Sequence, residues 1–470
     1  YRDFDGGRAF YTGGGHTDES FGDPAFLQHI LGGIEYAIGD NRLDYSKIRT
    51  QRVPDETRFV QTIFAQNLDE PMELDIFDDG RIIFVERKGA VKLFDQASGE
   101  LRTLATFAVN SKLEDGLEGV AIDPQYNENH WVYFFYSPPG PEPKQHVSRF
   151  IFKDDSLHLA SEQVIMEVPV QREECCHSAG CLEFGPDGLL YISVGDNTNP
   201  FASDGYAPID ERPGRSAWDA QRSSGNTNDL RGKILRIKVE ADGSYSIPEG
   251  NLFPKGTPNT RPEIYVMGLR NPFRLSVDSK RNWLFWGDVG PDAGKDGEGR
   301  GPKGYDALNL ATKPGFYGWP YFRGHHTYND YNFAAQKSGP LFNPENPIND
   351  SPNNTGLKEL PPYQKSLVWY SYDKSKEFPW VGVGGKNPMA GPVYYSDQYE
   401  GAAKFPEYFD GKVIFYEWMR HWMFVVRMDS LGQFDGADPF MPSTQFSRPM
   451  DMVFGKDGNL YMLEYGNAWF

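Results

Sequence analysis

Three side chains capable of chemistry stand next to one another at Cys175, Cys176 and His177. A neutral imidazole accepts a proton near pH 7, so His177 is a candidate general base, although an isolated histidine is more often a hydrogen-bonded loop residue. The two adjacent cysteines either form a strained vicinal disulfide or point to opposite sides of a strand as thiols. A pairing of Cys176 with Cys181 is a third arrangement, and the spacing does not match a structural zinc site.

The segments around this group belong to a loosely repeated hairpin unit. Each unit consists of a strand, a turn carrying Asp-Gly or its equivalent, and a second strand; the glycine accepts the positive φ that such a turn requires. Six copies predict an all-β, six-bladed β-propeller, with a β-sandwich array as the alternative. The clear copies are residues 77–87, 184–196 and 454–466, and the weaker ones are 122–137, 277–290 and 405–418.

The N-terminal segment, residues 1–45, has a different pattern and predicts a short α/β piece. Asp23 followed by Pro24 is a plausible helix start. Because one strand and one helix cannot bury a core alone, we expect either the end of a preceding α/β domain or an arm. The helical spacing is carried by Phe26, Leu27, Ile30, Leu31 and Ile34. The propeller is expected over residues 56–470, and the long gap at 291–404 is expected to form loops over one face.

Composition limits the partners of the chain. The 470 residues carry a formal net charge of −19, which disfavours nucleic acid and anionic lipid. No apolar run approaches the roughly 20 residues of a membrane helix. The chain begins at Tyr1 without Met and stops at YGNAWF, before the strand expected to finish the last blade, so we expect a piece of a larger protein.

The segment CCHSAGCLEFGPDGLLYISVGDNT at 175–198 is one of five motifs that occur in order along the chain. Together they resemble the glucose/sorbosone dehydrogenase family, which includes the soluble sugar dehydrogenases that depend on pyrroloquinoline quinone (PQQ). Residues 1 to about 42 resemble the end of a trehalose-utilisation (ThuA-like) domain. The other four motifs lie at 114–137, 230–237, 264–278 and 287–324.

This resemblance implies roles for particular residues. His177 matches the family's catalytic histidine, and Asp196 its paired carboxylate. Arg270 and Asn271 match the pair that binds PQQ, since a guanidinium offers planar donors to carboxylates and stabilises a developing oxyanion. Three further residues match the family's calcium site: Gly290 and Pro291 would bind the ion through their backbone carbonyls, and Asp306 matches the acidic position.

Some positions depart from the family pattern. Arg448 matches one of two cofactor-binding arginines, but Met450 stands at the second. Arg420 is the nearest substitute for the family's cofactor lysine. Glu114 stands where glucose enzymes carry a glutamine near the substrate, beside Asp115. The resemblance also suggests that a Cys175–Cys176 disulfide would present a flat apolar surface to PQQ.

The function expected from these residues is oxidation of a sugar hydroxyl, with Ca²⁺ and PQQ as cofactors and hydride transfer to PQQ. The partners would be a small sugar substrate and a downstream electron acceptor such as a cytochrome c, and the location periplasmic or secreted. Two alternatives are a calcium-dependent propeller hydrolase or lactonase, and a non-catalytic carbohydrate-binding propeller.

Overall fold

The computed structural model describes residues 2–4, 7–39 and 53–467. The chain divides into two compact units, Tyr1–Val53 and Pro54–Phe470. Each unit is described separately below.

The first unit contains the predicted helix. The helix α2 (Pro24–Ile38) begins at Asp23, whose carboxylate accepts hydrogen bonds from the backbone N–H groups of Ala25 and Phe26. Pro24 occupies the first turn, where a missing N–H breaks no helical bond. The remaining elements are β1 (Arg2–Phe4), β2 (Gly7–Ala9) and α1 (Asp18–Gly22).

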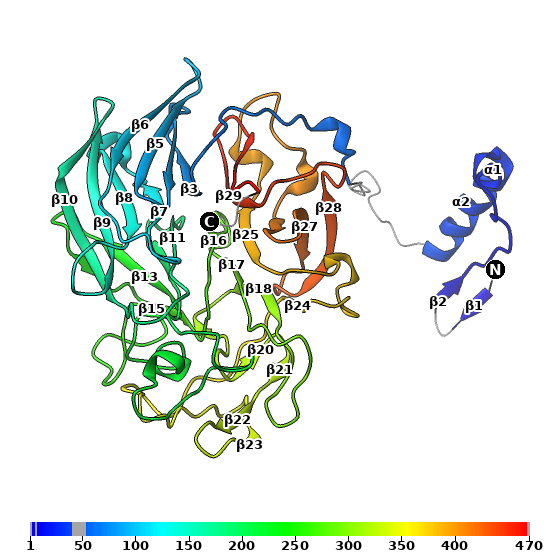
Figure 1. Ribbon diagram of the computed structural model, residues 1–470. Helices are drawn as coiled ribbons and strands as arrows, with labels where there is room; N and C mark the ends of the chain where they lie inside the picture. Colours follow the sequence, from blue (N-terminus) through cyan, green and yellow to red (C-terminus); the bar gives the residue numbers. More distant parts are fainter. Residues whose placement is uncertain (1, 5–6, 40–52, 468–470) are drawn as a thin grey trace. The chain divides into compact units, whose positions relative to one another are not determined.

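The second unit is a β-propeller, as predicted. Six sheets follow one another along the chain as blades, and all are antiparallel except the third, in which β15 and β19 pair in parallel (Figure 1). The first two blades are β3 (Pro71–Ile76), β4 (Ile82–Glu86), β5 (Ala90–Asp95), β6 (Glu100–Thr106), then β7 (Leu117–Ile122), β8 (Trp131–Tyr136), β9 (Lys144–Lys153), β10 (Ser156–Pro169). The third blade is β11 (Ala179–Phe184), β12 (Leu190–Val194), β13 (Lys233–Val239), β15 (Ile264–Met267), joined by β14 (Tyr245–Ser246) and β19 (Gly315–Phe316).

The last three blades complete the ring. The fourth is β16 (Leu275–Val277), β17 (Leu284–Asp288), β18 (Asp306–Ala311), β24 (Val368–Tyr370); the fifth is β25 (Pro388–Val393), β26 (Val413–Glu417), β27 (Trp422–Met428), β28 (Phe434–Phe440); the sixth, within the described residues, is the pair β29 (Pro449–Phe454) and β30 (Leu460–Glu464). Short helices are α3 (Tyr126–Asn129) and the 3₁₀ turns η2 (Glu56–Arg58), η3 (Ser216–Trp218), η4 (Ala220–Arg222), η5 (Pro379–Val381), η6 (Ser396–Gln398) and η7 (Glu407–Phe409).

The six repeated sequence units correspond to the six blades. In each blade the repeat spans the connection from the innermost strand to the second strand. The innermost strands β3, β7, β11, β16, β25 and β29 pack side by side in that order, and β29 returns to β3 (Figure 1). Radial repetition of this kind leaves few open sheet edges.

Buried carboxylates join neighbouring innermost strands. Glu73 of β3 accepts a hydrogen bond from the Val120 N–H of β7 at 2.8 Å, and Asp451 of β29 accepts one from the Leu74 N–H of β3 at 2.9 Å. Between the strands lies a central cavity of about 290 Å³, whose lining includes both carboxylates. The fully buried Arg274 guanidinium donates to the Met72 carbonyl at 2.6 Å and lies 3.8 Å from Asp451. These contacts pair groups that would otherwise be buried without partners.

The long segment 291–404 contains more regular structure than the predicted loops. Besides strands of the fourth and fifth blades it holds two extra hairpins, formed by β20 (Phe322–Arg323) with β21 (His326–Thr327), and by β22 (Asn329–Asn332) with β23 (Lys337–Leu341). Buried aromatic side chains such as Trp319, Tyr321 and Tyr328 anchor this segment. The strands of these hairpins are only two to five residues long, too short to give a repeated pattern in the sequence.

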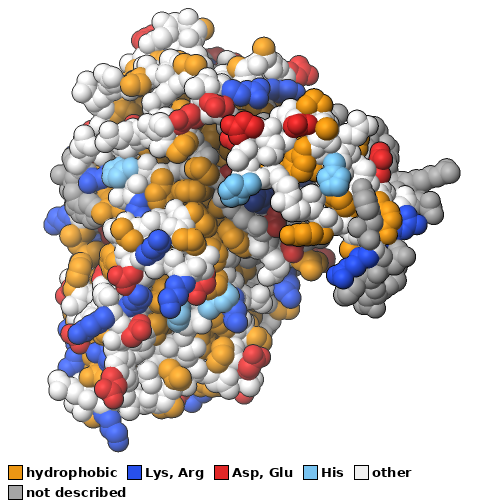
Figure 2. All heavy atoms as spheres, turned by 90° about the vertical axis from the view of Figure 1, so that its right-hand side faces the viewer, with side chains coloured by type: hydrophobic (Ala, Val, Ile, Leu, Met, Phe, Trp, Pro, Cys, Tyr) orange, Lys and Arg blue, Asp and Glu red, His pale blue; other side chains and the backbone are white. Residues whose placement is uncertain are grey.

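The surface is mixed in character. On the face shown in Figure 2, acidic and basic side chains are interspersed among apolar ones. Among the described residues, no helix is long and apolar enough to cross a membrane.

The central carboxylates predict a pH-dependent stability. Burial raises the pKa of Glu73 to about 8, with the Asp451 carboxylate adding to the rise and Arg274 opposing it. The folded state therefore holds a proton that the unfolded state releases above about pH 4.5, so this stabilisation is complete below pH 4.5 and is lost as the pH rises through 8. Between pH 4.5 and 8 the free energy of unfolding of the wild type should fall, relative to that of Glu73→Gln, by on the order of 1.4 kcal/mol per pH unit.

Denaturant unfolding at pH 5 and pH 8 would measure this difference. Glu100→Gln, on the exposed edge strand β6, is the matched control and should behave as the wild type. Identical pH dependence in Glu73→Gln and wild type would contradict the prediction.

Candidate active site

The sequence-predicted residues come together because of how the chain runs through each blade. The repeated turns lie at one end of the innermost strands, so the starts of those strands and the ends of the second strands lie at the opposite end, called here the top face. Glu114 and Asp115 precede β7, His177 precedes β11, Asp196 follows β12, and Arg270 precedes β16. Alternating strand direction therefore brings segments 150 residues apart to one face.

His177 and Asp196 form the central pair of the site. His177 Nδ1 lies 2.6 Å from Asp196 Oδ1, and both side chains are buried. Asp196 also accepts hydrogen bonds from the Thr198 backbone N–H at 2.9 Å and from the Trp319 indole N–H at 2.8 Å. A carboxylate surrounded by donors fixes the imidazole with its proton on Nδ1, which leaves the Nε2 lone pair to accept a proton.

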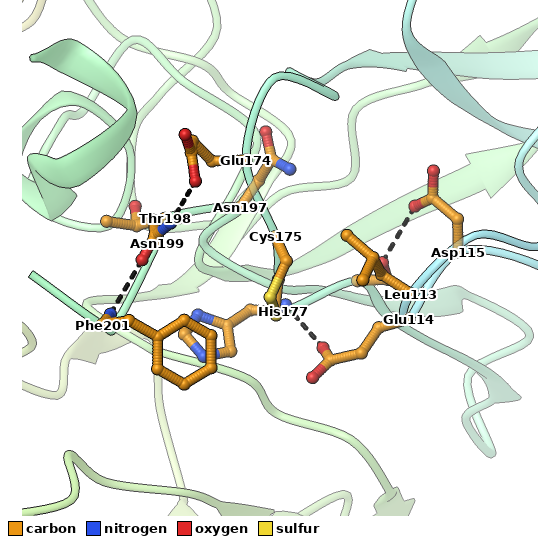
Figure 3. Close-up of a disulfide and its surroundings, with 12 residues drawn as sticks. Leu113, Glu114, Asp115, Glu174, Cys175, His177, Asn197, Thr198, Asn199 and Phe201 are labelled. Carbon is orange, nitrogen blue, oxygen red and sulfur yellow. Dashed lines mark hydrogen bonds between the residues drawn. A yellow bond between two sulfur atoms is a disulfide. The ribbon is translucent and has the colours of Figure 1, made fainter. Parts of the chain in front are cut away.

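The backbone around His177 is held in an uncommon conformation. Its φ is +67°, in the left-handed region that non-glycine residues seldom occupy. The His177 N–H donates to Glu114 Oε2 at 2.6 Å (Figure 3). Gly195 packs directly against the His177 carbonyl, and a Cβ added at Gly195 would collide with that carbonyl and lie 2.9 Å from Asn271 Oδ1.

The adjacent cysteines form a disulfide. Cys175 and Cys176 are bonded to each other across a cis peptide, and Cys181 is a buried free thiol. The disulfide lies beside His177, with Glu174 hydrogen-bonded to Asn199 on its other side (Figure 3). Of the three predicted arrangements, the structure therefore shows the vicinal one.

The Asp115 carboxylate is hydrogen-bonded to three side chains of the protein. Its carboxylate accepts hydrogen bonds from Asn110 at 2.7 Å, from Arg172 at 3.0 Å and from the Ser178 hydroxyl at 3.0 Å. These bonds tie the loop before β7 to the loop before β11. Asp115 thus positions the segments that carry Glu114 and His177.

Arg270 and Asn271 are fixed through their backbones. Both N–H groups donate to Asp288, at 3.2 and 2.8 Å, and the Asp196 N–H donates to the Arg270 carbonyl at 2.8 Å. The Arg270 guanidinium is buried and lies 3.8 Å from the carboxylate of Asp292, whose side chain is about half exposed. Asn271 Oδ1 is buried and has no hydrogen-bond partner among the described residues.

Arg222 adds a second buried cation that the motifs did not indicate. One of its terminal nitrogens donates to the Asn197 carbonyl at 3.3 Å, beside Asp196, while its Nε is buried without a partner in the described part of the chain. Burial, with a smaller effect of Arg231, lowers the pKa of Arg222 to about 10. The two weakly compensated guanidinium groups fit an anionic ligand rich in oxygen, such as PQQ, whereas the Asn271 amide oxygen can only accept a hydrogen bond from an N–H or O–H group of a ligand.

In this structure the predicted calcium ligands contact the ammonium group of a lysine. Lys386, which precedes β25, places its ammonium 2.7 Å from Asp306 Oδ1 and 3.1 Å from the Pro291 carbonyl oxygen. The same Asp306 oxygen accepts the Gly290 N–H at 2.8 Å. Charges of +1 and +2 about 4 Å apart repel by roughly 8 kcal/mol at an effective dielectric constant of 20. The residues present therefore do not fit a calcium ion here, and the calcium assignment to Gly290, Pro291 and Asp306 needs correction.

Arg420 and Arg448 form a separate group over the fifth and sixth blades. The Arg420 guanidinium donates to four carbonyl oxygens, those of Ser371, Val381, Gly384 and Gly385, at 2.6–3.1 Å. It therefore holds the loop between β24 and β25. Arg448 lies over the Trp418 ring at 4.6 Å, and Met450 is buried in the apolar core.

Sequence reasoning missed Trp319 and Lys386. Trp319 lies in the family-like motif at 287–324, and the resemblance implies no role for its indole. Lys386 stands in GGKNP, between two glycines and a proline, where no spacing relates it to Asp306, 80 residues earlier. A lone lysine in a glycine-rich segment before an innermost strand was the available signal.

Comparison with known proteins identifies the family. The sequence profile of glucose/sorbosone dehydrogenases matches residues 68–350, and that of trehalose-utilisation (ThuA) proteins matches residues 1–37. The chain belongs to the glucose/sorbosone dehydrogenase family. The family match covers the His177, Asp196 and Arg270 segments but ends before Lys386.

The proteins similar to this chain include named sugar dehydrogenases and a protein whose name states no activity. Quinoprotein glucose dehydrogenase B of Acinetobacter calcoaceticus is 24% identical over 440 residues, 86% of this chain and 85% of that protein. The HIPL2 protein of Arabidopsis thaliana is 34% identical over 158 residues, 31% of this chain, which spans only 18% of HIPL2. The PQQ-bound aldose sugar dehydrogenase of Streptomyces coelicolor shares the fold, with a TM-score of 0.57 at 18% identity over 87% of this chain and 94% of that one.

Packing at Gly195 gives a prediction for the glucose/sorbosone dehydrogenase site. Gly195→Ala should displace the His177 backbone and destabilise the protein by about 1–3 kcal/mol, because the added methyl group has no space. Thermal unfolding would measure this. Gly294→Ala, where an added Cβ meets nothing within 4 Å, should change stability by no more than about 0.5 kcal/mol. Equal melting temperatures for the two variants would contradict the close packing.

Proposed function

We propose that this protein is a PQQ-dependent sugar dehydrogenase. The observation that carries the proposal is the buried His177–Asp196 pair, oriented by Trp319 and adjoining Arg270 on the top face of the propeller. This arrangement supplies a general base close to a buried guanidinium group. Family membership supports redox chemistry on a carbohydrate.

The chain's residues have defined tasks in this reaction. His177 Nε2 accepts the proton of a sugar hydroxyl, while Asp196 stabilises the imidazolium that forms. Trp319 and Thr198 hold the Asp196 carboxylate in place. Arg270 and Arg222 bind and orient anionic oxygens of the cofactor, and Glu114 lies at the rim where a substrate hydroxyl would enter. When bound, PQQ supplies the two-electron acceptor for the hydride that leaves the sugar carbon.

The disulfide supports two further parts of the proposal. Its sulfur atoms offer an apolar surface one residue from the base, suited to a flat cofactor ring. Disulfides persist in oxidising compartments, so we place the protein in the periplasm or outside the cell. Reoxidation of the cofactor would then fall to a small electron carrier such as a cytochrome c.

Reconstitution tests this function directly. Purified protein would be titrated with PQQ and assayed with an artificial electron dye and a panel of aldoses and oligosaccharides. Sugar-dependent dye reduction that requires PQQ would establish the activity. Sugar binding without PQQ binding would instead indicate a carbohydrate-binding propeller, and lactone cleavage without dye reduction would indicate a hydrolase.

The base assignment predicts the phenotype of a single variant. His177→Ala should lower kcat by about 100- to 10,000-fold while PQQ binding is retained, because the imidazole moves a proton and does not hold the cofactor's charge. Activity assays and PQQ titration by absorbance would separate the two effects. His158→Ala, at an exposed position of β10, is the matched control. Normal turnover in His177→Ala would rule out this base.

A further inference from the structure

Lys386 is a buried ammonium group built into the top face. It donates to Asp306 Oδ1 and to the Pro291 carbonyl oxygen, and its side chain is 3% exposed. The ammonium also lies 4.5 Å from the centre of the Tyr372 ring. A carboxylate, a carbonyl and an aromatic face together stabilise the positive charge of this ammonium group, with two of its three N–H donors used.

The same group adjoins the proposed cofactor pocket. The Tyr372 hydroxyl donates to Asp292 at 3.2 Å, and Asp292 is the partner of Arg270 at 3.8 Å. The Tyr372–Asp292 pair therefore links the two cations, with Lys386 against the Tyr372 ring and Arg270 near the Asp292 carboxylate. An ammonium group has three N–H donors, of which two are used by Asp306 and Pro291, so the third is available to an oxygen atom of a ligand.

We propose that Lys386 replaces the calcium ion expected at Gly290, Pro291 and Asp306, and that this tethered cation, with Arg270, binds the anionic oxygens of the cofactor without a metal. The positive charge that a calcium ion would bring to the cofactor is then supplied by the Lys386 side chain. A lysine is a compact point charge and suits this task better than the planar arginine fork. The cofactor part of this inference rests on the proposed function, whereas the replacement of the metal does not.

The replacement is tested by calcium binding in the absence of any cofactor. Melting temperatures and calorimetric titrations would be recorded with EDTA and with Ca²⁺ for the wild type, Asp306→Asn, Lys386→Ala and Lys386→Ala/Asp306→Asn. We expect no response in the wild type, a saturable response in Lys386→Ala with a rise of a few degrees, and its loss in the double variant.

Three results would overturn the replacement. One is a stoichiometric Ca²⁺ response of the wild type that Asp306→Asn abolishes, since the metal would then bind beside Lys386. A second is the absence of a response in both the wild type and Lys386→Ala, since these oxygens would not form a cation site. The third is a response of Lys386→Ala that survives in the double variant, since the metal would then bind elsewhere. The wild-type measurement stands even if a variant fails to fold.

The cofactor part is tested by PQQ titration in EDTA. The wild type should bind PQQ without metal, and Lys386→Met, which keeps the apolar stem, should bind it about tenfold more weakly or worse. Lys303→Met is the control, because Lys303 pairs with the exposed Asp373 at 2.6 Å and should leave the affinity unchanged. Calcium-dependent binding that is equal in wild type and Lys386→Met would overturn this part. Absence of PQQ binding in every variant would refute the proposed function and leave the calcium result standing.

Discussion

The propeller depends on hydrogen bonds between the innermost strand of one blade and a buried carboxylate of the next. Adjacent blades share no continuous ladder of backbone bonds, so their innermost N–H groups need another acceptor. Glu73 supplies it between β3 and β7, and Asp451 supplies it where the last blade meets the first. Arg274 crosses the centre and offsets part of the negative charge. The relative position of the top-face loops follows from this ring.

The active-site candidates inherit their geometry from that ring. Four of the six loops that enter an innermost strand contribute one part each: Glu114 before β7, His177 before β11, Arg270 before β16 and Lys386 before β25. Backbone hydrogen bonds then fix the loops to one another, as between Asp196 and Arg270. The base and the cationic pocket are thus held by scaffold contacts rather than by the preferences of their own residues, which the left-handed conformation of His177 illustrates.

The repeats carried enough information to predict the six blades, because an Asp-Gly turn between apolar strands is a local signal. The grouping of His177, Asp196 and Arg270 was expected from the family resemblance of the motifs that carry these residues. Trp319 and Lys386 were not, because their roles arise from contacts across long insertions: Trp319 reaches Asp196 across 123 positions and Lys386 reaches Asp306 across 80. Likewise, Arg420 was assigned to the cofactor by its residue type, while its four carbonyl partners are visible only in the fold.

The hydrogen bonds of Arg420 affect how substitutions at this position should be interpreted. Its guanidinium bonds to the Gly385 carbonyl, directly before Lys386, and to three other carbonyls of the same loop. A substitution at Arg420 would release the loop and displace the ammonium group. In a mutational scan it would score with the ligand-binding positions, although in this structure the Arg420 side chain is bound to the protein itself. Epistasis between positions 420 and 386 would distinguish this indirect effect from direct contact, because the loss at one position would mask the loss at the other.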